Sequence, residues 1–175
     1  MELRIASLSD VPALAQLIEA SGRDLSAGFY SPEQTDAIVR HVFGVDSQLI
    51  EDKTYFVIER DRRLAASGGW SKRRTLFGGD QAKRGPDPLL DPATDSARIR
   101  AFFVSPDNVR QGLGRQLMAA CAAAASQAGF TSLELVSTLP GEPLYLASGF
   151  NVVKRFELEL PEGIRVPVSR MFKDI

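Results

Sequence analysis

The chain has 175 residues, of which 44% are hydrophobic and 25% charged, and this size and balance are typical of one globular domain. Its 21 Lys and Arg against 22 Asp and Glu give a net charge of −1, which argues against a general nucleic-acid-binding protein, because such proteins are basic. One cysteine, Cys121, excludes an intramolecular disulfide, and one histidine, His41, argues against a zinc site.

The N-terminal segment MELRIASLSD predicts a short strand over residues 3–5, because apolar residues alternate there. It carries an acidic residue and no long apolar run, so it does not look like a signal peptide. No stretch of about 20 apolar residues occurs anywhere in the chain, so we also expect no membrane-spanning segment. These features together predict a cytoplasmic protein.

Two helices are predicted next. Asp10 and Pro12 are typical of a helix start, and apolar residues at helical spacing continue to Gly22, which suits the C-terminal end of a helix. The second helix begins with a capping box, in which Ser31 is the N-cap and Gln34 closes the box, and it runs to about residue 43.

The middle of the chain predicts two adjacent strands and a long loop. Residues 55–58 and 64–73 are rich in strand-forming residues and are separated by a tight turn. The second strand contains Gly68 and Gly69, which suggest a bulge or a close backbone approach. Residues 78–96 are rich in Gly, Pro and Asp, so we expect a loop.

The remaining segments alternate strands with helices. We expect strands at 98–104, 132–137, 151–160 and 166–172, and helices at 112–128 and 143–148. The chain is therefore predicted to be one α/β domain of the α+β type over residues 1–175, with a mixed central sheet of about seven strands flanked by helices.

The most informative stretch joins the strand at 98–104 to the following helix through a loop with two glycines, Gly112 and Gly114. The first turn of a helix has unpaired N–H groups and a positive dipole end. Glycines allow close approach of a phosphate to the backbone, and Arg110 and Arg115 add positive charge. This pattern predicts a phosphate or pyrophosphate cradle, although a tight turn without a ligand would have the same two glycines.

Two common nucleotide-binding motifs do not fit this loop. A dinucleotide-binding fingerprint requires a third glycine where this chain has Leu117, and a P-loop requires a Gly-Lys-Ser/Thr triplet that is absent. A nucleotide-binding α/β domain is therefore disfavoured.

Residues 98–150 resemble the GNAT superfamily of acyl-CoA-dependent N-acyltransferases. The strand ends at Val104-Ser105-Pro106, and Gly112 and Gly114 fill the two glycine positions of the family motif Gln/Arg-x-x-Gly-x-Gly/Ala. Tyr145-Leu146-Ala147-Ser148-Gly149-Phe150 is similar to the family's Tyr-x-x-x-Gly-Phe. Residues 1–95 resemble the family only in the order of their elements.

The resemblance implies a role for each matching residue. The amides of the loop would hold the pyrophosphate of acetyl-CoA, and the backbones of Phe103 and Val104 would pair with its pantetheine arm. Tyr145 would protonate the departing thiolate, which suits a phenol that is protonated at neutral pH. The implied cofactor-binding residues are Phe103, Val104, Val109, Arg110, Gln111, Gly112, Leu113, Gly114 and Arg115.

Three positions depart from the family pattern. Val109 stands where Gln or Arg is usual, residues 138–141 replace an asparagine that contacts the cofactor, and Arg98 replaces a glutamate that acts as base. An arginine cannot be that base. The remaining candidates for the base are Asp95, Glu134, Asp80 and His41, and none is distinguished by the sequence. Cys121, in a helix of small residues, is expected to fill space rather than act as a nucleophile.

Five residues are candidates for acceptor binding. Arg98 and Arg100 share one face of a strand and could fix an anionic group of the acceptor. Tyr30 and Trp70, together with Phe77, lie where the resemblance places the walls of the acceptor site, and could contact an amine through their rings. The two arginines could equally be solvated or ion-paired, and aromatic residues in such positions more often belong to the core.

We therefore expect an N-acetyltransferase that transfers an acetyl group from acetyl-CoA to a primary amine by direct attack in a ternary complex, without a metal. The alternative is a non-catalytic acyl-CoA-binding module. The expected partner is a small-molecule or peptide amine, with no nucleic acid or membrane. The sequence identifies neither the acceptor nor the oligomeric state, and a homodimer is compatible with it.

Overall fold

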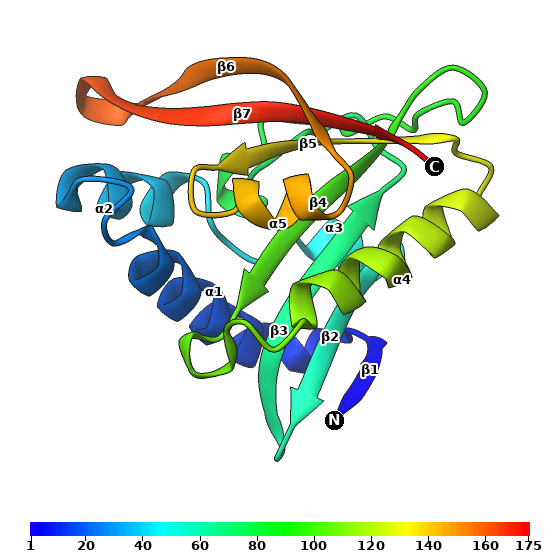
Figure 1. Ribbon diagram of the computed structural model, residues 1–175, viewed down its shortest axis with the longest axis horizontal. Helices are drawn as coiled ribbons and strands as arrows, with labels where there is room; N and C mark the ends of the chain where they lie inside the picture. Colours follow the sequence, from blue (N-terminus) through cyan, green and yellow to red (C-terminus); the bar gives the residue numbers. More distant parts are fainter.

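A seven-stranded mixed sheet is the centre of the molecule in a computed structural model that describes residues 1–175 (Figure 1). The strand order is β1-β2-β3-β4-β5-β7-β6, and every neighbouring pair is antiparallel except β4 and β5. The strands are β1 Glu2–Ile5, β2 Tyr55–Arg60, β3 Arg63–Ser71, β4 Ala97–Val104, β5 Ser132–Thr138, β6 Asn151–Leu160 and β7 Ile164–Asp174. The predicted fold class and number of strands are confirmed.

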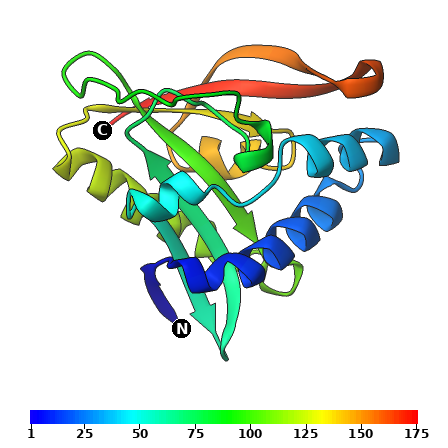
Figure 2. The ribbon, with the colours of Figure 1, turned by 180° about the vertical axis from the view of Figure 1, so that it is seen from behind.

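Five α-helices cover the two faces of this sheet: α1 Val11–Ser26, α2 Pro32–His41, α3 Ser47–Glu51, α4 Leu113–Gln127 and α5 Glu142–Ala147. The first three lie on one face and the last two on the other, as the opposite views of Figures 1 and 2 show. No helix combines the length and the apolar character that crossing a membrane would require.

Strand β2 shows how the sequence builds a core on both faces. Tyr55 and Val57 pack among residues of α1 and α3, whereas Ile58 packs against Leu113 and Leu117 of α4. Successive strand residues point to opposite faces, so an apolar run such as Tyr-Phe-Val-Ile suits a sheet that is covered on both sides.

Two local features differ from the sequence predictions. Helix α1 continues through Gly22 to Ser26 rather than ending at Gly22. A Cβ at Gly22 would lie 2.7 Å from the Phe43 ring, so this glycine allows a close helix contact rather than a helix end. Helix α3 was not predicted, because it has only five residues and depends on Asp46, whose carboxylate accepts from the Gln48 amide.

Candidate active site

A groove opens where β4 and β5 separate. The two strands pair only at Ala97 with Leu133 and at Arg98 with Glu134, and beyond these pairs they diverge towards their carboxyl ends. The divergence leaves a cavity, which we call the donor groove, between α1, the ends of β4 and β5, and the start of α5. Its 14 lining residues are Ser21, Gly22, Leu25, Ser26, Phe43, Phe102, Phe103, Val104, Gly114, Thr138, Pro140, Gly141, Leu144 and Tyr145.

The end of β4 presents the backbone of Val104, and not that of Phe103, to this groove. The Ser105 amide donates to the Ala65 carbonyl of β3 at 2.8 Å. Hydrogen-bonding direction alternates along an antiparallel strand, so Phe103 also faces β3 and Val104 faces away from it. The Val104 amide donates to the Ser21 hydroxyl of α1 at 3.2 Å. Of the two residues expected to pair with a pantetheine arm, Val104 therefore has the suitable direction.

A bulge in β4 changes the direction in which the side chains of its last residues point. Gly69 is paired with Arg100 and Ser67 with Phe103, so one extra residue lies on β4, and Ala101 has a positive φ of 57°. A bulge of this kind shifts which face the following side chains reach. Phe102 consequently packs against the Tyr145 ring on one face, and Phe103 against the Phe43 ring on the other.

The loop before α4 carries a continuous set of unpaired amides. None of the N–H groups of residues 109–115 donates to an acceptor within the protein. Gly112 is the N-cap of α4 with φ 80°, and Arg110 also has a positive φ of 61°. This conformation leaves the amides free at the positive end of a 15-residue helix, which is the arrangement that binds phosphate groups.

The side chains of this loop differ in their burial. Val109, Arg110, Gln111 and Arg115 are exposed, whereas Leu113 is buried against β2 and β3. The Gln111 amide oxygen accepts from Arg60 at 2.9 Å, which brings a third arginine to the same edge of the molecule. The two arginines predicted for the cradle are thus free of ion pairs and accessible.

Gly114 connects the cradle to α5. A Cβ at this position would lie 2.8 Å from a methyl group of Leu144, so only glycine allows the first turn of α4 to approach α5 this closely. Leu144 precedes Tyr145 in the chain. The second motif glycine therefore serves helix packing beside the tyrosine as well as the cradle.

Tyr145 lies on α5 with its ring between Phe102 and Phe150 in edge contacts. The side chain is buried, yet its hydroxyl makes no hydrogen bond within the protein and borders the donor groove. Burial raises the pKa of this phenol well above its usual value. The hydroxyl is therefore protonated at neutral pH and is free to donate a hydrogen bond to a bound molecule.

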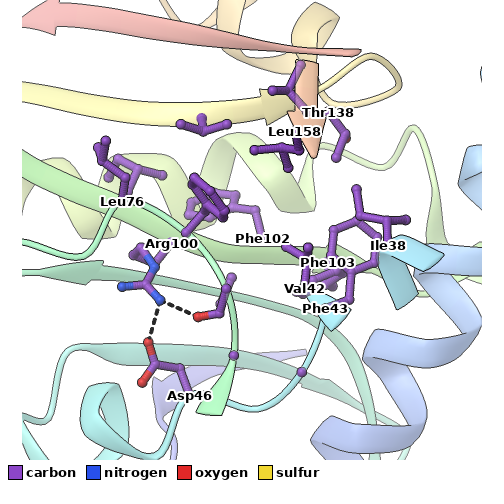
Figure 3. A pocket seen from close by; sticks show the side chains of 18 of the residues that line it. Ile38, Val42, Phe43, Asp46, Leu76, Arg100, Phe102, Phe103, Thr138 and Leu158 are labelled. Carbon is purple, nitrogen blue, oxygen red and sulfur yellow. Dashed lines mark hydrogen bonds and ion pairs between the residues drawn. The ribbon is translucent and has the colours of Figure 1, made fainter. Parts of the chain in front are cut away.

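A second cavity, which we call the acceptor cavity, lies between α2, the 76–79 segment, β4 and the β6–β7 hairpin (Figure 3). It is lined by 19 residues, of which 13 are hydrophobic. Five residues line both cavities: Phe43, Phe102, Phe103, Thr138 and Tyr145. The two spaces therefore meet beside the Tyr145 side chain.

The two arginines of β4 are held by internal partners. Arg98 forms an ion pair with Glu134 at 2.6 Å and donates to the Ser96 carbonyl. Arg100 is buried, forms an ion pair with Asp46 at 2.8 Å and donates to the Thr75 and Gly78 carbonyls. Both arginines thus donate to backbone carbonyls of the 74–78 segment. Of the two, Arg100 lines the acceptor cavity.

The three aromatic residues that were expected to line the acceptor site do not lie together in the structure. Phe77 lines the acceptor cavity, whereas Tyr30 and Trp70 line neither cavity. The Tyr30 hydroxyl donates to the Pro167 carbonyl at 2.6 Å and accepts from the Leu139 amide at 2.9 Å, which fixes the α1–α2 connection against β7. Trp70 packs against Phe130 on the α4 face of the sheet, opposite the acceptor cavity.

None of the four candidates for the base lines either cavity. Glu134 is buried and paired with Arg98 and Arg170. Asp95 accepts from the Asp91 amide, and Asp80 accepts from the Ser47 amide, so both stabilise turns. His41 is the last residue of α2. Cys121 is fully buried in the core beneath α4, and burial raises its pKa, so it is not an available nucleophile.

Three residues of this region were missed in the sequence. Asp46 is the one carboxylate that lines either cavity, Ser21 binds the end of β4, and Glu142 anchors α5 through Arg155 and Ser169. Each of them contacts a partner more than ten residues away in the chain, so no local sequence motif predicts its role. For Glu142, the one available signal was its place in the first turn of the short helix.

Comparison with sequence families identifies residues 16–150 with the acetyltransferase (GNAT) family. The matched region contains the cradle, the end of β4 and the Tyr145 segment, which are the parts that carried the resemblance in the sequence. No curated protein sequence matches the chain significantly.

Solved structures share the fold at low sequence identity. A GCN5-related N-acetyltransferase from Rhodopseudomonas palustris is 17% identical, with a TM-score of 0.70 over 99% of this chain and 95% of that one. The PaiA N-acetyltransferase from Thermoplasma acidophilum, solved with coenzyme A, is 15% identical, with a TM-score of 0.66 over 99% and 98%. A ribosomal-protein-alanine N-acetyltransferase from Brucella melitensis is 15% identical, with a TM-score of 0.65 over 100% of both chains.

Proposed function

The chain belongs to the acetyltransferase (GNAT) family, and on that premise we propose that it transfers the acetyl group of acetyl-CoA directly to a primary amine within a ternary complex. The observation that carries this proposal is the junction of the donor groove and the acceptor cavity beside Tyr145. Two cavities that share a wall allow both substrates to be bound at the same time with their reacting groups in contact.

The donor would be held along the groove by backbone groups. The unpaired amides of residues 109–115 suit the pyrophosphate, and exposed Arg110 and Arg115 suit its negative charge. The Val104 backbone, which faces the gap between β4 and β5, suits an amide of the pantetheine arm. The coenzyme A found in the related T. acidophilum structure supports this assignment of the donor.

Tyr145 is proposed as the general acid. The amine nitrogen forms a bond to the thioester carbonyl carbon while the carbon–sulfur bond breaks, and the departing thiolate takes the phenol proton. A phenol with a buried ring and a raised pKa, whose hydroxyl has no internal partner, retains its proton for this step. The amine proton leaves to water, because no unpaired carboxylate lines either cavity.

Direct transfer is favoured over a covalent acetyl-enzyme. Such an intermediate requires an accessible nucleophile activated by a neighbouring base. Cys121 is buried with a raised pKa, and His41 lines neither cavity.

The proposal is tested by calorimetric titration with acetyl-CoA, followed by a screen of amines in which thiol release and the acetylated product are both measured. We expect saturable acetyl-CoA binding and amine-dependent thiol release. Binding without transfer to any amine would identify the non-catalytic acyl-CoA-binding module instead, and the absence of binding would overturn both alternatives.

A further inference from the structure

The chemistry of the acceptor cavity narrows the class of amine that it can accept. Apolar residues from three separate parts of the chain line it: Ile38 of α2 with the following Val42, Phe77 of the 76–79 segment, and Leu158 and Val168 of the β6–β7 hairpin. Figure 3 shows Ile38, Val42 and Leu158 around this space. The phenyl rings of Phe102 and Phe103 close it on the side of the donor groove. Most of the side chains around this space are therefore hydrophobic.

The two charged residues of the cavity neutralise each other. Asp46 and Arg100 face one another at 2.8 Å, and their side chains are each only 2% exposed (Figure 3). Asp46 also binds Lys83 at 2.5 Å, and Arg100 also donates to two backbone carbonyls. The charges of Asp46 and Arg100 are therefore already paired with each other, so neither side chain offers an unpaired charge to a second ammonium group or to a carboxylate of a ligand.

The cavity is also small. Its volume is about 100 Å³, whereas an engineered apolar cavity of about 150 Å³ is large enough to hold benzene. Because the acceptor cavity continues into the donor groove beside Tyr145, a single ring or a short branched chain fits with its amine directed towards the groove.

We propose, on the basis of the function proposed above, that the acceptor is a primary amine carried on a compact apolar body, such as an aromatic ring, with no second charge. Burying an unpaired charge beside these hydrophobic side chains is costly, which disfavours amino acids and polyamines relative to a monoamine. The same environment disfavours an ammonium ion and lowers the pKa of the bound amine. A neutral nucleophile is thus supplied although Arg98 stands where the family places a basic glutamate.

Three acceptors that differ only in charge or shape test this proposal on the wild-type chain. They are 2-phenylethylamine, L-phenylalanine, which is the same amine with an added carboxylate, and 1,4-diaminobutane, which carries a second ammonium in place of the ring. With saturating acetyl-CoA, we expect kcat/KM for 2-phenylethylamine to exceed the other two values by about 10²-fold or more. Equal or higher values for the amino acid or the diamine would overturn the proposal.

A peptide with a free N-terminal amine completes the set, because it represents a macromolecular acceptor. If the peptide or the diamine is acetylated best, the inference about the acceptor fails while the proposed acetyltransferase activity stands. If acetyl-CoA binds and none of the four amines, nor any amine of the wider screen, is acetylated, the proposed function fails. The two failures are therefore distinguishable.

A matched pair of variants locates the acceptor. Phe77→Ala removes a ring from the acceptor cavity, and Phe29→Ala removes a ring that is 52% exposed and lines neither cavity. We expect Phe77→Ala to raise KM for 2-phenylethylamine about tenfold and to leave KM for acetyl-CoA unchanged, with no effect of Phe29→Ala on either value. Equal KM values for 2-phenylethylamine in Phe77→Ala and wild type would contradict binding in this cavity.

Discussion

At the scale of single residues, two tyrosines distinguish a reactive hydroxyl from a structural one. The Tyr145 hydroxyl has no internal partner and borders both cavities, whereas the Tyr30 hydroxyl joins the Pro167 carbonyl to the Leu139 amide. The same chemical change, removal of one oxygen, should therefore have opposite consequences at the two positions.

Tyr145→Phe should lower kcat by about 10²–10⁴-fold, the usual contribution of general acid catalysis, with acetyl-CoA affinity and the free energy of unfolding nearly unchanged. Tyr30→Phe should keep kcat and reduce the free energy of unfolding by about 1–2 kcal/mol, because two partly buried backbone groups lose their partner. Steady-state kinetics and urea unfolding measure both. Near-full kcat in Tyr145→Phe would show that water or another group protonates the thiolate.

The raised pKa of Tyr145 also predicts the form of the pH–rate profile. A phenol whose pKa lies above 10 remains protonated at all lower pH values, so the acid is present throughout the working range. The rate should rise with pH as the acceptor amine loses its proton and then stay level to about pH 10. A decline in kcat between about pH 8 and 9.5 that disappears in Tyr145→Phe would contradict the raised pKa of Tyr145, because it would show the phenol losing its proton in that range.

At the scale of elements, the start of α4 contains a glycine that can be tested against a matched position. Gly112 has φ 80°, and a Cβ added there would meet no atom within 4 Å. Gly163, in the β6–β7 turn, has φ 72° with equally open surroundings. Aspartate at either position has the same backbone strain, but only Gly112 lies in the proposed cradle.

Gly112→Asp should weaken acetyl-CoA binding at least tenfold, because it places a negative charge at the anion site. Gly163→Asp should bind acetyl-CoA like the wild type, and both variants should lose a similar amount of stability, about 1 kcal/mol. Calorimetric titration gives the affinities and thermal unfolding gives the stabilities. Equal affinities in the two folded variants would remove the cradle from this loop.

The junction of β1 and α1 contains an ion pair whose strength depends on pH. Arg4 donates to both Asp10 oxygens at 2.9 and 2.8 Å, and Asp10 also accepts from the Ser7 amide. These contacts, led by the Arg4 hydrogen bond, lower the pKa of Asp10 from 3.8 to about 2. The stabilisation is therefore complete above about pH 4 and is lost as the pH falls towards 2.

Asp10→Asn should reduce the free energy of unfolding at pH 7 by about 1–2 kcal/mol, and the difference from wild type should narrow between about pH 4 and pH 2. Asp36→Asn is the control, because Asp36 is 46% exposed and pairs with surface arginines, so it should cost less than about 0.5 kcal/mol. Urea unfolding at several pH values measures both. A difference that is independent of pH would rule out the ion pair as its source.

The elements that could be predicted from the sequence are those with local signals. The capping box of Ser31 and Gln34, the apolar run of β2 and the glycine loop before α4 all specify their structure within a few residues. Helix α3 and the true end of α1 could not be predicted, because they depend on the contacts of Asp46 and on the packing of Gly22 against Phe43.

At the scale of the whole molecule, the candidate site also has one part that local sequence signals predict and one part that they do not. The loop before α4, the end of β4 and Tyr145 lie within residues 98–150, so they could be named from the sequence, whereas the α1 side of the donor groove could not. The acceptor cavity combines α2, the 76–79 segment, β4 and the β6–β7 hairpin, so its lining depends on the assembled sheet. The alternation of side chains along a strand placed Arg98 and Arg100 on one face. Only the fold shows that each of them forms an ion pair with a carboxylate of this chain.

The sheet itself creates the arrangement that the proposed reaction needs. The parallel pair β4 and β5 is the one place where neighbouring strands separate, and the bulge at Ala101 directs Phe102 and Phe103 to opposite faces of the resulting gap. The donor groove and the acceptor cavity consequently share a wall at Tyr145.

Initial rates measured with acetyl-CoA and the best amine of the screen varied together test direct transfer between these two cavities. The shared wall predicts intersecting double-reciprocal lines, because both substrates must be bound before the acetyl group moves. Parallel lines would require release of the thiol before the amine binds, and hence an acetylated enzyme, which would contradict direct transfer.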